Sequence, residues 1–224
     1  MNYVKNCLIV TMLLGGLYSQ CNEDNWEDYY PEMAGCYLAY ASLQGANLSY
    51  ANLSYANLQM ADLQGANLEG TASYLTEFTG AYLHDANLSY AELYFSSFNH
   101  ANFSGANLEG VDLEGTDLSG ADFTGANLHE ADLSWASFES AILYEANLSY
   151  TNCWGTSFIH ANLNNTIFDG AELIYAYFDE NNDYYDDSSY EAGYESVDVG
   201  DMNDDGANDV LDVVLLVNDI LLTP

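Results

Sequence analysis

The chain has 224 residues, enough for one or two structural units, and 49% of them are hydrophobic, which is ample for a buried core. It carries 35 acidic residues against one basic residue, Lys5, so its formal net charge is −34. This charge excludes direct binding to nucleic acid phosphates or to an anionic membrane surface, and it favours cations and basic surfaces as partners.

Residues 1–20 have the pattern of a secretory signal. Lys5 supplies the positive start, the apolar run that follows is too short to span a bilayer, and Ser19 is a small residue suited to cleavage. A buried N-terminal strand or helix is the alternative. A lipid anchor at Cys21 ranks below simple secretion, because Gln20 stands where a lipobox has a small residue. We therefore expect a secreted or cell-surface protein.

Residues 21–35 are acidic and aromatic, and we expect them to cap the N-terminal end of the repeats that follow. Cys21 and Cys36 flank this cap. Export permits disulfides, so these two cysteines are candidates for a bridge between the cap and the first repeats.

Residues 36–180 form 29 consecutive quintets in one unbroken frame. The first position is Ala in 20 quintets, and the third is Leu in 19 and Phe in 8. Only Ser73 and Cys153 depart from Leu or Phe at the third position, and we expect Cys153 to be a buried free thiol. An internal repeat of this regularity decides the fold before any other feature does.

A period of five fits neither regular helix nor straight strand. In a helix the apolar positions would spiral around every face, and in a strand successive pairs would fall on opposite faces. A short extended step followed by a corner satisfies the pattern, with the first and third residues pointing inward each time. The chain is then a solenoid whose coils stack at roughly 4.8 Å, the spacing of hydrogen-bonded strands.

This pattern resembles the pentapeptide-repeat family, whose motif is A-(D/N)-L-x-x. The resemblance implies an all-β fold, a right-handed quadrilateral β-helix of about seven coils with four quintets in each coil. Some members of the family are acidic dimeric rods that resemble duplex DNA and occupy the DNA site of gyrase. A homodimer and a DNA mimic therefore enter as hypotheses.

Residues 20 apart are neighbours on one face, so the exposed columns can be written from the frame. One face has an aromatic and apolar stripe at its fourth and fifth positions, formed by Tyr55, Tyr74, Leu75, Tyr94, Phe95, Trp135, Trp154, Ile174 and Tyr175. An apolar stripe of this length marks a contact surface. The alternative is that the N-terminal segment or a C-terminal helix folds over it.

Glu92, Asp112, Asp132 and Glu172 align in a second-position column, which we interpret as solvated acids rather than a calcium site. The four histidines fall on different faces or several coils apart, too far to share a metal. The sequence shows no Ser-His-Asp set, no phosphate loop and no Lys or Arg to stabilise a developing anion. We therefore expect no enzymatic activity.

Residues 181–197 lose the period and read as an acidic linker, and residues 198–224 change character again. This tail has the oxygen ligands of a calcium loop at positions 1, 3, 5, 9 and 12, a backbone carbonyl at position 7, a Gly at position 6 and an apolar run after it. The predicted ligands of Ca²⁺ are Asp201, Asn203, Asp205, Ala207, Asp209 and Asp212. An acidic disordered tail is the alternative.

The tail resembles a single dockerin-type repeat, the EF-hand-like calcium loop and helix of secreted bacterial proteins. A functional dockerin has two such repeats, so the single copy supports calcium binding more than cohesin binding. The leading hypothesis is an exported, non-catalytic scaffold with a calcium-binding tail and an unidentified protein partner. The alternatives are a DNA mimic acting on gyrase, if the protein is cytoplasmic, and an accessory subunit of a dockerin-type polysaccharide-degrading system.

Overall fold

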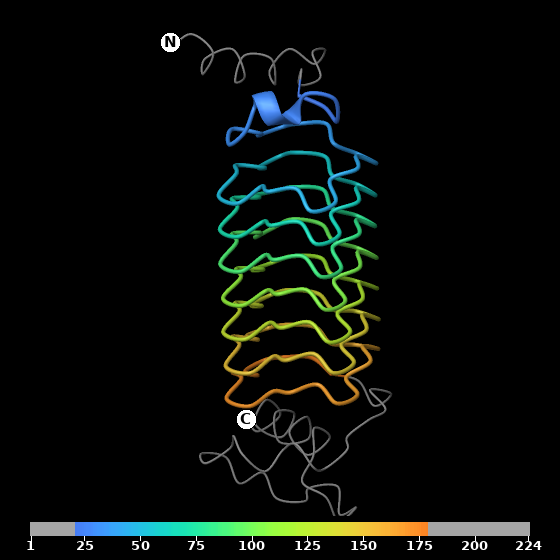
Figure 1. The fold of residues 1–224 in the computed structure, drawn as a ribbon. Helices are drawn as coiled ribbons and strands as arrows, with labels where there is room; N and C mark the ends of the chain where they lie inside the picture. Colours follow the sequence, from blue (N-terminus) through green and yellow to red (C-terminus); the bar gives the residue numbers. More distant parts are fainter. Residues whose placement is uncertain (1–20, 179–224) are drawn as a thin grey trace, which may run out of the picture.

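The computed structural model describes residues 21–178 (Figure 1). The expected signal at 1–20, the linker at 181–197 and the calcium repeat at 198–224 lie outside the described residues. Within residues 21–178 the chain winds into stacked coils, and its one helix is the 3₁₀ element η1, Trp26–Asp28.

Each coil pairs with the next through parallel β-bridges between second-position residues exactly one coil apart in sequence. Asn47 bridges Asn67, Asn67 bridges Asn87, and the column continues in steps of 20 residues to Ile167. Three other columns repeat the same step, so one coil contains four quintets. The predicted four-sided β-helix is confirmed for the described residues. The extended steps are so short that each contributes a bridge rather than a long strand.

The corners between quintets use one backbone conformation. Every fifth-position residue from Gly35 to Tyr175 has a positive φ, between 52° and 71°. The next first-position N–H donates to the third-position carbonyl, as Ala41 does to Leu38 at 3.1 Å, and a positive φ before the donor is the mark of a type II turn. Many of these corners are not glycine, so the stacked ladder must offset about 1–3 kcal/mol of strain at each.

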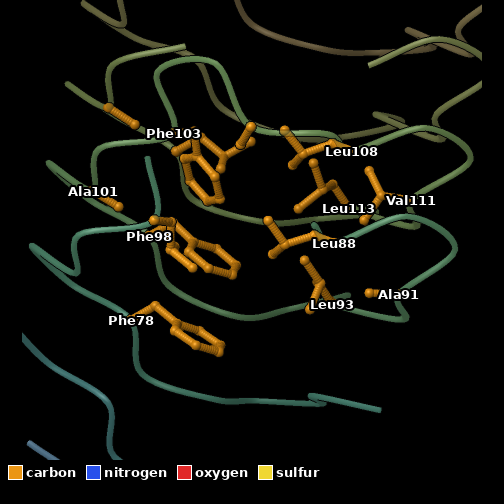
Figure 2. Close-up of a cluster of buried hydrophobic side chains, with 14 of the residues drawn as sticks. Phe78, Leu88, Ala91, Leu93, Phe98, Ala101, Phe103, Leu108, Val111 and Leu113 are labelled. Carbon is orange, nitrogen blue, oxygen red and sulfur yellow. The ribbon is translucent and has the colours of Figure 1, made fainter. Parts of the chain in front are cut away.

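The core consists of the first-position and third-position side chains, nearly all of them fully buried. Phenylalanines of successive coils stack, with ring centroids 4.5 Å apart for Phe78 and Phe98 and 4.6 Å apart for Phe103 and Phe123. Figure 2 shows the rings of Phe78, Phe98 and Phe103 on one side of the interior and a group of leucines, including Leu108, facing them. The inward assignment of both positions is confirmed.

The segment before the repeats lies at the N-terminal end of the stack (Figure 1). The repeat begins at Pro31, a quintet earlier than predicted, because Met33 is buried at a third position and Gly35 has the corner conformation. Before it, η1 places Trp26 against the core at the end of the stack. Cys21 and Cys36 form a disulfide with Cα atoms 4.9 Å apart, which fastens this cap to the first coil.

Buried hydroxyls at first positions are accommodated by carbonyls of the preceding coil. Thr76 donates through Oγ1 to the Leu53 carbonyl at 2.8 Å, and Thr156 donates to the Leu133 carbonyl at 2.7 Å. Each bond joins residues 23 apart, so it adds a link between two coils. At Thr76 and Thr156 the hydroxyl that replaces Ala in the core is therefore satisfied by the neighbouring coil, whereas the Thr71 hydroxyl has no hydrogen-bond partner among the described residues.

Candidate interaction surfaces

The structure divides the predicted aromatic stripe into two clusters along one corner of the rod. In the first cluster, Tyr74 lies 5.6 Å from Tyr55 and 6.2 Å from Phe95 between ring centroids, edge-on to both. Tyr94 adds to this group at 5.4 Å from Tyr74, and Leu75 is an exposed corner residue between Tyr55 and Phe95 in the same column. The geometry is an edge-to-face array, which stabilises aromatic pairs beyond their buried area.

The second cluster lies toward the C-terminal end of the same corner. Trp154 packs edge-on against Trp135 at 4.5 Å and against Tyr175 at 5.8 Å, and Ile174 is exposed beside them. The Trp135 ring covers Gly155, where a Cβ would lie 2.7 Å from it, yet 54% of Trp135 remains exposed. One ring face is therefore covered and the other faces solvent.

The predicted acidic column lies on the strand next to this corner. Asp132 accepts hydrogen bonds from the Ser134 N–H at 2.9 Å and from Asn152 Nδ2 at 3.2 Å. Asp112 accepts from the Glu114 N–H at 3.0 Å. These carboxylates fix the turns that follow them. Within residues 21–178 no group of three or more His, Cys, Asp or Glu side chains is placed to hold a metal ion.

The other polar groups of the described chain form no recognisable catalytic set. His129 contacts Ser149 Oγ through Nδ1 at 2.8 Å and Glu130 through Nε2 at 3.5 Å. An open pocket of about 530 Å³ lies between the cap and the first coil, and Glu27 is the one carboxylate in its lining. Cys153 is a buried free thiol, and burial raises its pKa to about 12, so it is not a nucleophile at neutral pH.

A second aromatic row, not anticipated from the sequence, lies at the neighbouring corner. Tyrosine and glycine alternate there in steps of 20 residues from Tyr50 to Gly110, and the column continues with Glu130, Tyr150 and Gly170. We call Tyr50, Tyr90 and Glu130, with the carboxylates beside them, the tyrosine row. The Tyr90 ring lies over Gly110, where a Cβ would be 2.7 Å away, and Tyr50 lies over Gly70 in the same way. The alternation of tyrosine and glycine in the sequence could have revealed this row, because only glycine leaves room for a ring from the previous coil.

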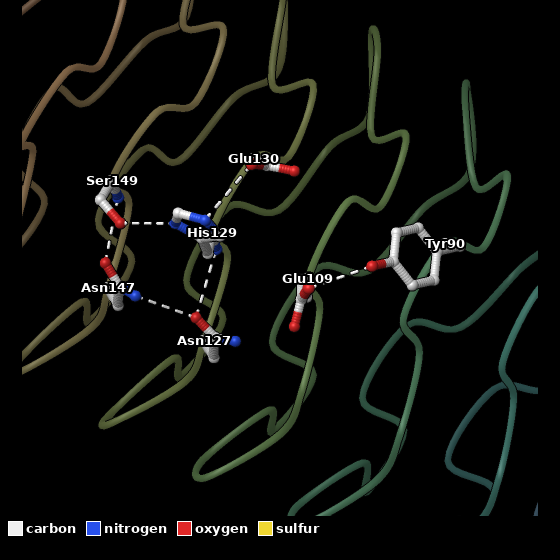
Figure 3. A network of polar contacts seen from close by, with 7 residues as sticks. All are labelled: Tyr90, Glu109, Asn127, His129, Glu130, Asn147 and Ser149. Atoms are coloured by element: carbon white, nitrogen blue, oxygen red, sulfur yellow. Dashed lines mark hydrogen bonds and ion pairs between the residues drawn. The ribbon is translucent and has the colours of Figure 1, made fainter.

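Each of these tyrosines also reaches a carboxylate of the next coil. The hydroxyl of Tyr50 donates to Glu69 at 2.9 Å, and that of Tyr90 donates to Glu109 at 3.0 Å (Figure 3). These hydrogen bonds to an anion raise the pKa of both phenols. The result is a repeated unit two coils apart, in which a flat exposed ring has a carboxylate at its edge.

An asparagine ladder runs along the side next to the tyrosine row. Asn147 donates from Nδ2 to Asn127 Oδ1 at 3.0 Å (Figure 3). The same bond recurs from coil to coil back to Asn47. Each Oδ1 also accepts the N–H two residues on, as in an Asx turn. The asparagine side chains are thus engaged in hydrogen bonds within the rod, and this ladder holds the corner rings in register.

The remaining predicted site falls outside the described residues. The calcium ligands, Asp201, Asn203, Asp205, Ala207, Asp209 and Asp212, belong to the segment after residue 178. The segments considered as covers for the aromatic stripe lie outside it as well. In residues 21–178 there is no helix of the length and apolarity needed to cross a membrane.

The chain belongs to the pentapeptide-repeat family. The family model "Pentapeptide repeats" matches eight copies over residues 32–70, 76–115, 106–144 and 146–180. The match omits residues 71–75, the quintet that contains Ser73. No curated protein matches the chain.

Solved structures of other pentapeptide-repeat proteins are similar to this chain. HetL, involved in heterocyst differentiation regulation in the cyanobacterium Nostoc, is 29% identical, with 65% of this chain and 79% of HetL covered and a TM-score of 0.28. A thylakoid lumen protein of Arabidopsis thaliana is 24% identical (62% and 90% covered, TM-score 0.40). QnrB1, a plasmid-mediated fluoroquinolone resistance protein, is 16% identical (65% and 81% covered, TM-score 0.42).

Proposed function

We propose that this protein is an exported, non-catalytic interaction module. In this proposal the acidic β-helix is a rigid scaffold, the aromatic stripe contacts a protein partner, and residues 198–222 bind Ca²⁺. The observation that carries the proposal is the stripe itself. Large apolar side chains such as Trp135 and Ile174 are more than half exposed on a surface that is otherwise strongly acidic.

The two-cluster geometry supports a protein contact. Exposed aromatic residues that are already held by edge-to-face neighbours lose little side-chain entropy on binding, which suits them as anchors. Between the clusters lies the coil of Glu114 and Gly115, where the Phe95 ring covers the glycine. The stripe therefore offers two separate anchoring points on one rigid corner.

A photocrosslinking amino acid at Trp135, in cells that produce the full chain, tests the contact. The matched control replaces Tyr144, an exposed aromatic residue in another column. A crosslink to a distinct protein or a second copy from position 135, absent from position 144, is the expected result. A crosslink from position 135 to the chain's own residues 1–20 or 179–224 would show that the stripe is an internal packing surface.

Export and calcium binding need their own measurements. N-terminal sequencing of the mature protein should find the first 20 or so residues removed, and an intact Met1 on a cytosolic protein would contradict export.

Calorimetry on the full chain should detect Ca²⁺ binding, and Asp201→Ala combined with Asp212→Ala should abolish it. Calcium binding that is unchanged in this double variant would show that the ions bind elsewhere on the acidic surface.

The second candidate function is that of a DNA mimic acting on gyrase. One observation favours it, the net charge of −34, since residues 21–178 contain no Lys or Arg at all. It requires a cytoplasmic protein, so the N-terminal sequencing above decides between the two. A role in a dockerin-type polysaccharide-degrading system depends on the calcium-binding tail, and the calorimetry tests its first requirement.

A further inference from the structure

We propose that the tyrosine row binds an arginine-rich segment of a partner protein, extended as a polyproline II helix. This site is separate from the aromatic stripe and does not depend on the function proposed above. In the complex, guanidinium groups lie on the exposed faces of Tyr50 and Tyr90, and a third pairs with Glu130 at the next equivalent corner.

The rings present one free face each. Tyr90 is 59% exposed although its inner face covers Gly110, and Tyr50 is 67% exposed over Gly70. An aromatic face that is fixed flat on a rigid surface attracts cations through its quadrupole. Guanidinium is planar and stacks on such a face, so arginine fits this surface better than the compact ammonium of lysine.

Carboxylates line the row on both sides. Glu69 and Glu109 each accept a tyrosine hydroxyl through Oε1, so the second carboxylate oxygen is available to a guanidinium. On the other side, the next strand of the coil carries Asp112 and Asp132. Residues 21–178 contain no Lys or Arg to pair with these carboxylates, and among the carboxylates of the row Glu130 has His129 Nε2 at 3.5 Å, so the complementary partner is basic.

The spacing selects the conformation of the partner. Tyr50, Tyr90 and Glu130 follow each other at 40 residues, which is two coils, or roughly 9.6 Å at the usual strand spacing. A polyproline II helix brings every third residue to the same side after roughly 9.3 Å. A β-strand does not match, because residues on one side of it recur after roughly 6.7 Å. Arginine at every third position therefore places one guanidinium at each corner.

Calorimetry with the full chain tests this site. The probe is a synthetic peptide with four arginines, each separated by two prolines. Two control peptides have the same composition with irregular arginine spacing, or lysine in place of arginine. We expect the regular arginine peptide to bind most tightly, and each control to bind several-fold more weakly.

Variants locate the site on the rod. Tyr90→Leu and Glu109→Gln should each weaken binding of the regular peptide by about three- to five-fold, the size expected for an exposed cation–π contact or charge pair. The matched controls are Tyr40→Leu, an exposed tyrosine at a different corner, and Glu139→Gln on another side, and neither should change the affinity. Tyr40, Tyr90 and Glu139 are exposed and Glu109 is partly exposed, and equal thermal midpoints confirm that the variants fold.

Two results would overturn the assignment. Equal binding of the three peptides, or equal loss in the site and control variants, would mean that only the general acidity of the rod attracts basic chains. Binding of a neutral β-linked oligosaccharide that depends on Tyr90, without binding of the peptide, would make the row a glycan surface instead. Failure of the Trp135 crosslink has no bearing on either result, because it concerns another corner.

Discussion

The quintets 71–75 and 151–155 stand in the same column and share an unusual pair of inward residues. Each has Thr where Ala is usual and a smaller side chain, Ser73 or Cys153, where Leu or Phe is usual. All of these side chains are fully buried. The larger first residue partly compensates for the smaller third residue in both quintets, and yet their backbones differ.

Around Cys153 the backbone remains regular. The turn bond from the Thr156 N–H to the Cys153 carbonyl is 3.1 Å, and the Gly155 N–H donates to the next coil at 3.0 Å. Thr151 is satisfied by the Leu148 carbonyl at 2.7 Å, and its hydroxyl lies 3.2 Å from Cys153 Sγ. Sulfur is a weak hydrogen-bonding atom, so it fills part of the leucine space without demanding a partner.

Around Ser73 two backbone bonds are replaced or missing. The Thr76 N–H donates to Ser96 Oγ at 3.0 Å instead of closing its turn, and Ser96 donates in return to the Ser73 carbonyl. The described ladder also has no bond from the Leu75 N–H to the next coil. The hydroxyls of Thr71 and Ser73 find no protein partner. The comparison teaches that the core tolerates a smaller third residue when it is cysteine, whereas at Ser73 the corner is distorted and Ser96 of the next coil takes over the bonds of the turn.

Leu113→Ser should have the largest effect, because it places serine in this column without either a Thr at position 111 or a Ser at position 136 to compensate. Loss of a buried leucine and burial of an unpaired hydroxyl should lower the free energy of unfolding by about 3–6 kcal/mol. Urea unfolding measures it, with Glu114→Ser as the exposed control. Equal stability of the two variants would refute the distinction between inward and outward positions.

The second-largest difference between the two quintets should appear in the stability of the protein at high pH. The folded-state pKa of Cys153 is raised to about 12 by burial, so the folded protein keeps a proton that the unfolded chain loses from about pH 9 upward. Stability from this thiol is therefore full below pH 9 and falls by about 1.4 kcal/mol per pH unit between 9 and 12. Unfolding at pH 8 and pH 11 should show a steeper loss in the natural protein than in Cys153→Val, which shares every other titrating group.

Cys153→Ser should make the second quintet resemble the first. Position 176 is Ala where the first quintet has Ser96 in the next coil, so no serine is present to bond the Thr156 N–H and the carbonyl of residue 153 as Ser96 bonds the Thr76 N–H and the Ser73 carbonyl. We expect a loss of about 1–3 kcal/mol, the cost of a buried unpaired hydroxyl, and faster hydrogen exchange at the Gly155 amide. Cys153→Val is the apolar control, with a change below about 1.5 kcal/mol. Unchanged exchange at Gly155 would mean that serine does not cause the distortion at the corner.

Ser73→Cys is the converse change and should have the smallest effect. Removing the unpaired hydroxyl and adding a larger, less polar atom should stabilise the protein by about 1 kcal/mol. Hydrogen exchange at the Leu75 amide should slow if the missing ladder bond forms. An increase in exchange there would show that the irregular corner is set by Ser96 rather than by Ser73.

Much of the fold and of the aromatic stripe could be predicted from the sequence, because the unbroken frame of five residues assigns each residue number a position on the coil. The place of a residue in its quintet is enough to predict that Leu108 points inward and that Trp135 and Trp154 share a corner. The distortion at Ser73 depends on Ser96, a residue of the next coil, and so on side-chain geometry rather than on the frame. The tyrosine row was missed for the same reason, since Tyr90 meets Glu109 only because a corner ring crosses to the following coil.

The asparagine ladder has a consequence for how the chain can change in length. Its bonds join identical residues 20 positions apart, so removing or duplicating one whole coil would leave each column in register with itself. Removing a single quintet would also preserve the inward pattern, but it would rotate all later surface residues by one side, so a deletion between residues 50 and 90 would separate Tyr50 from Tyr90 and one between residues 95 and 135 would separate Phe95 from Trp135. The smallest insertion or deletion that preserves both the core and the surfaces is therefore one full turn of the solenoid.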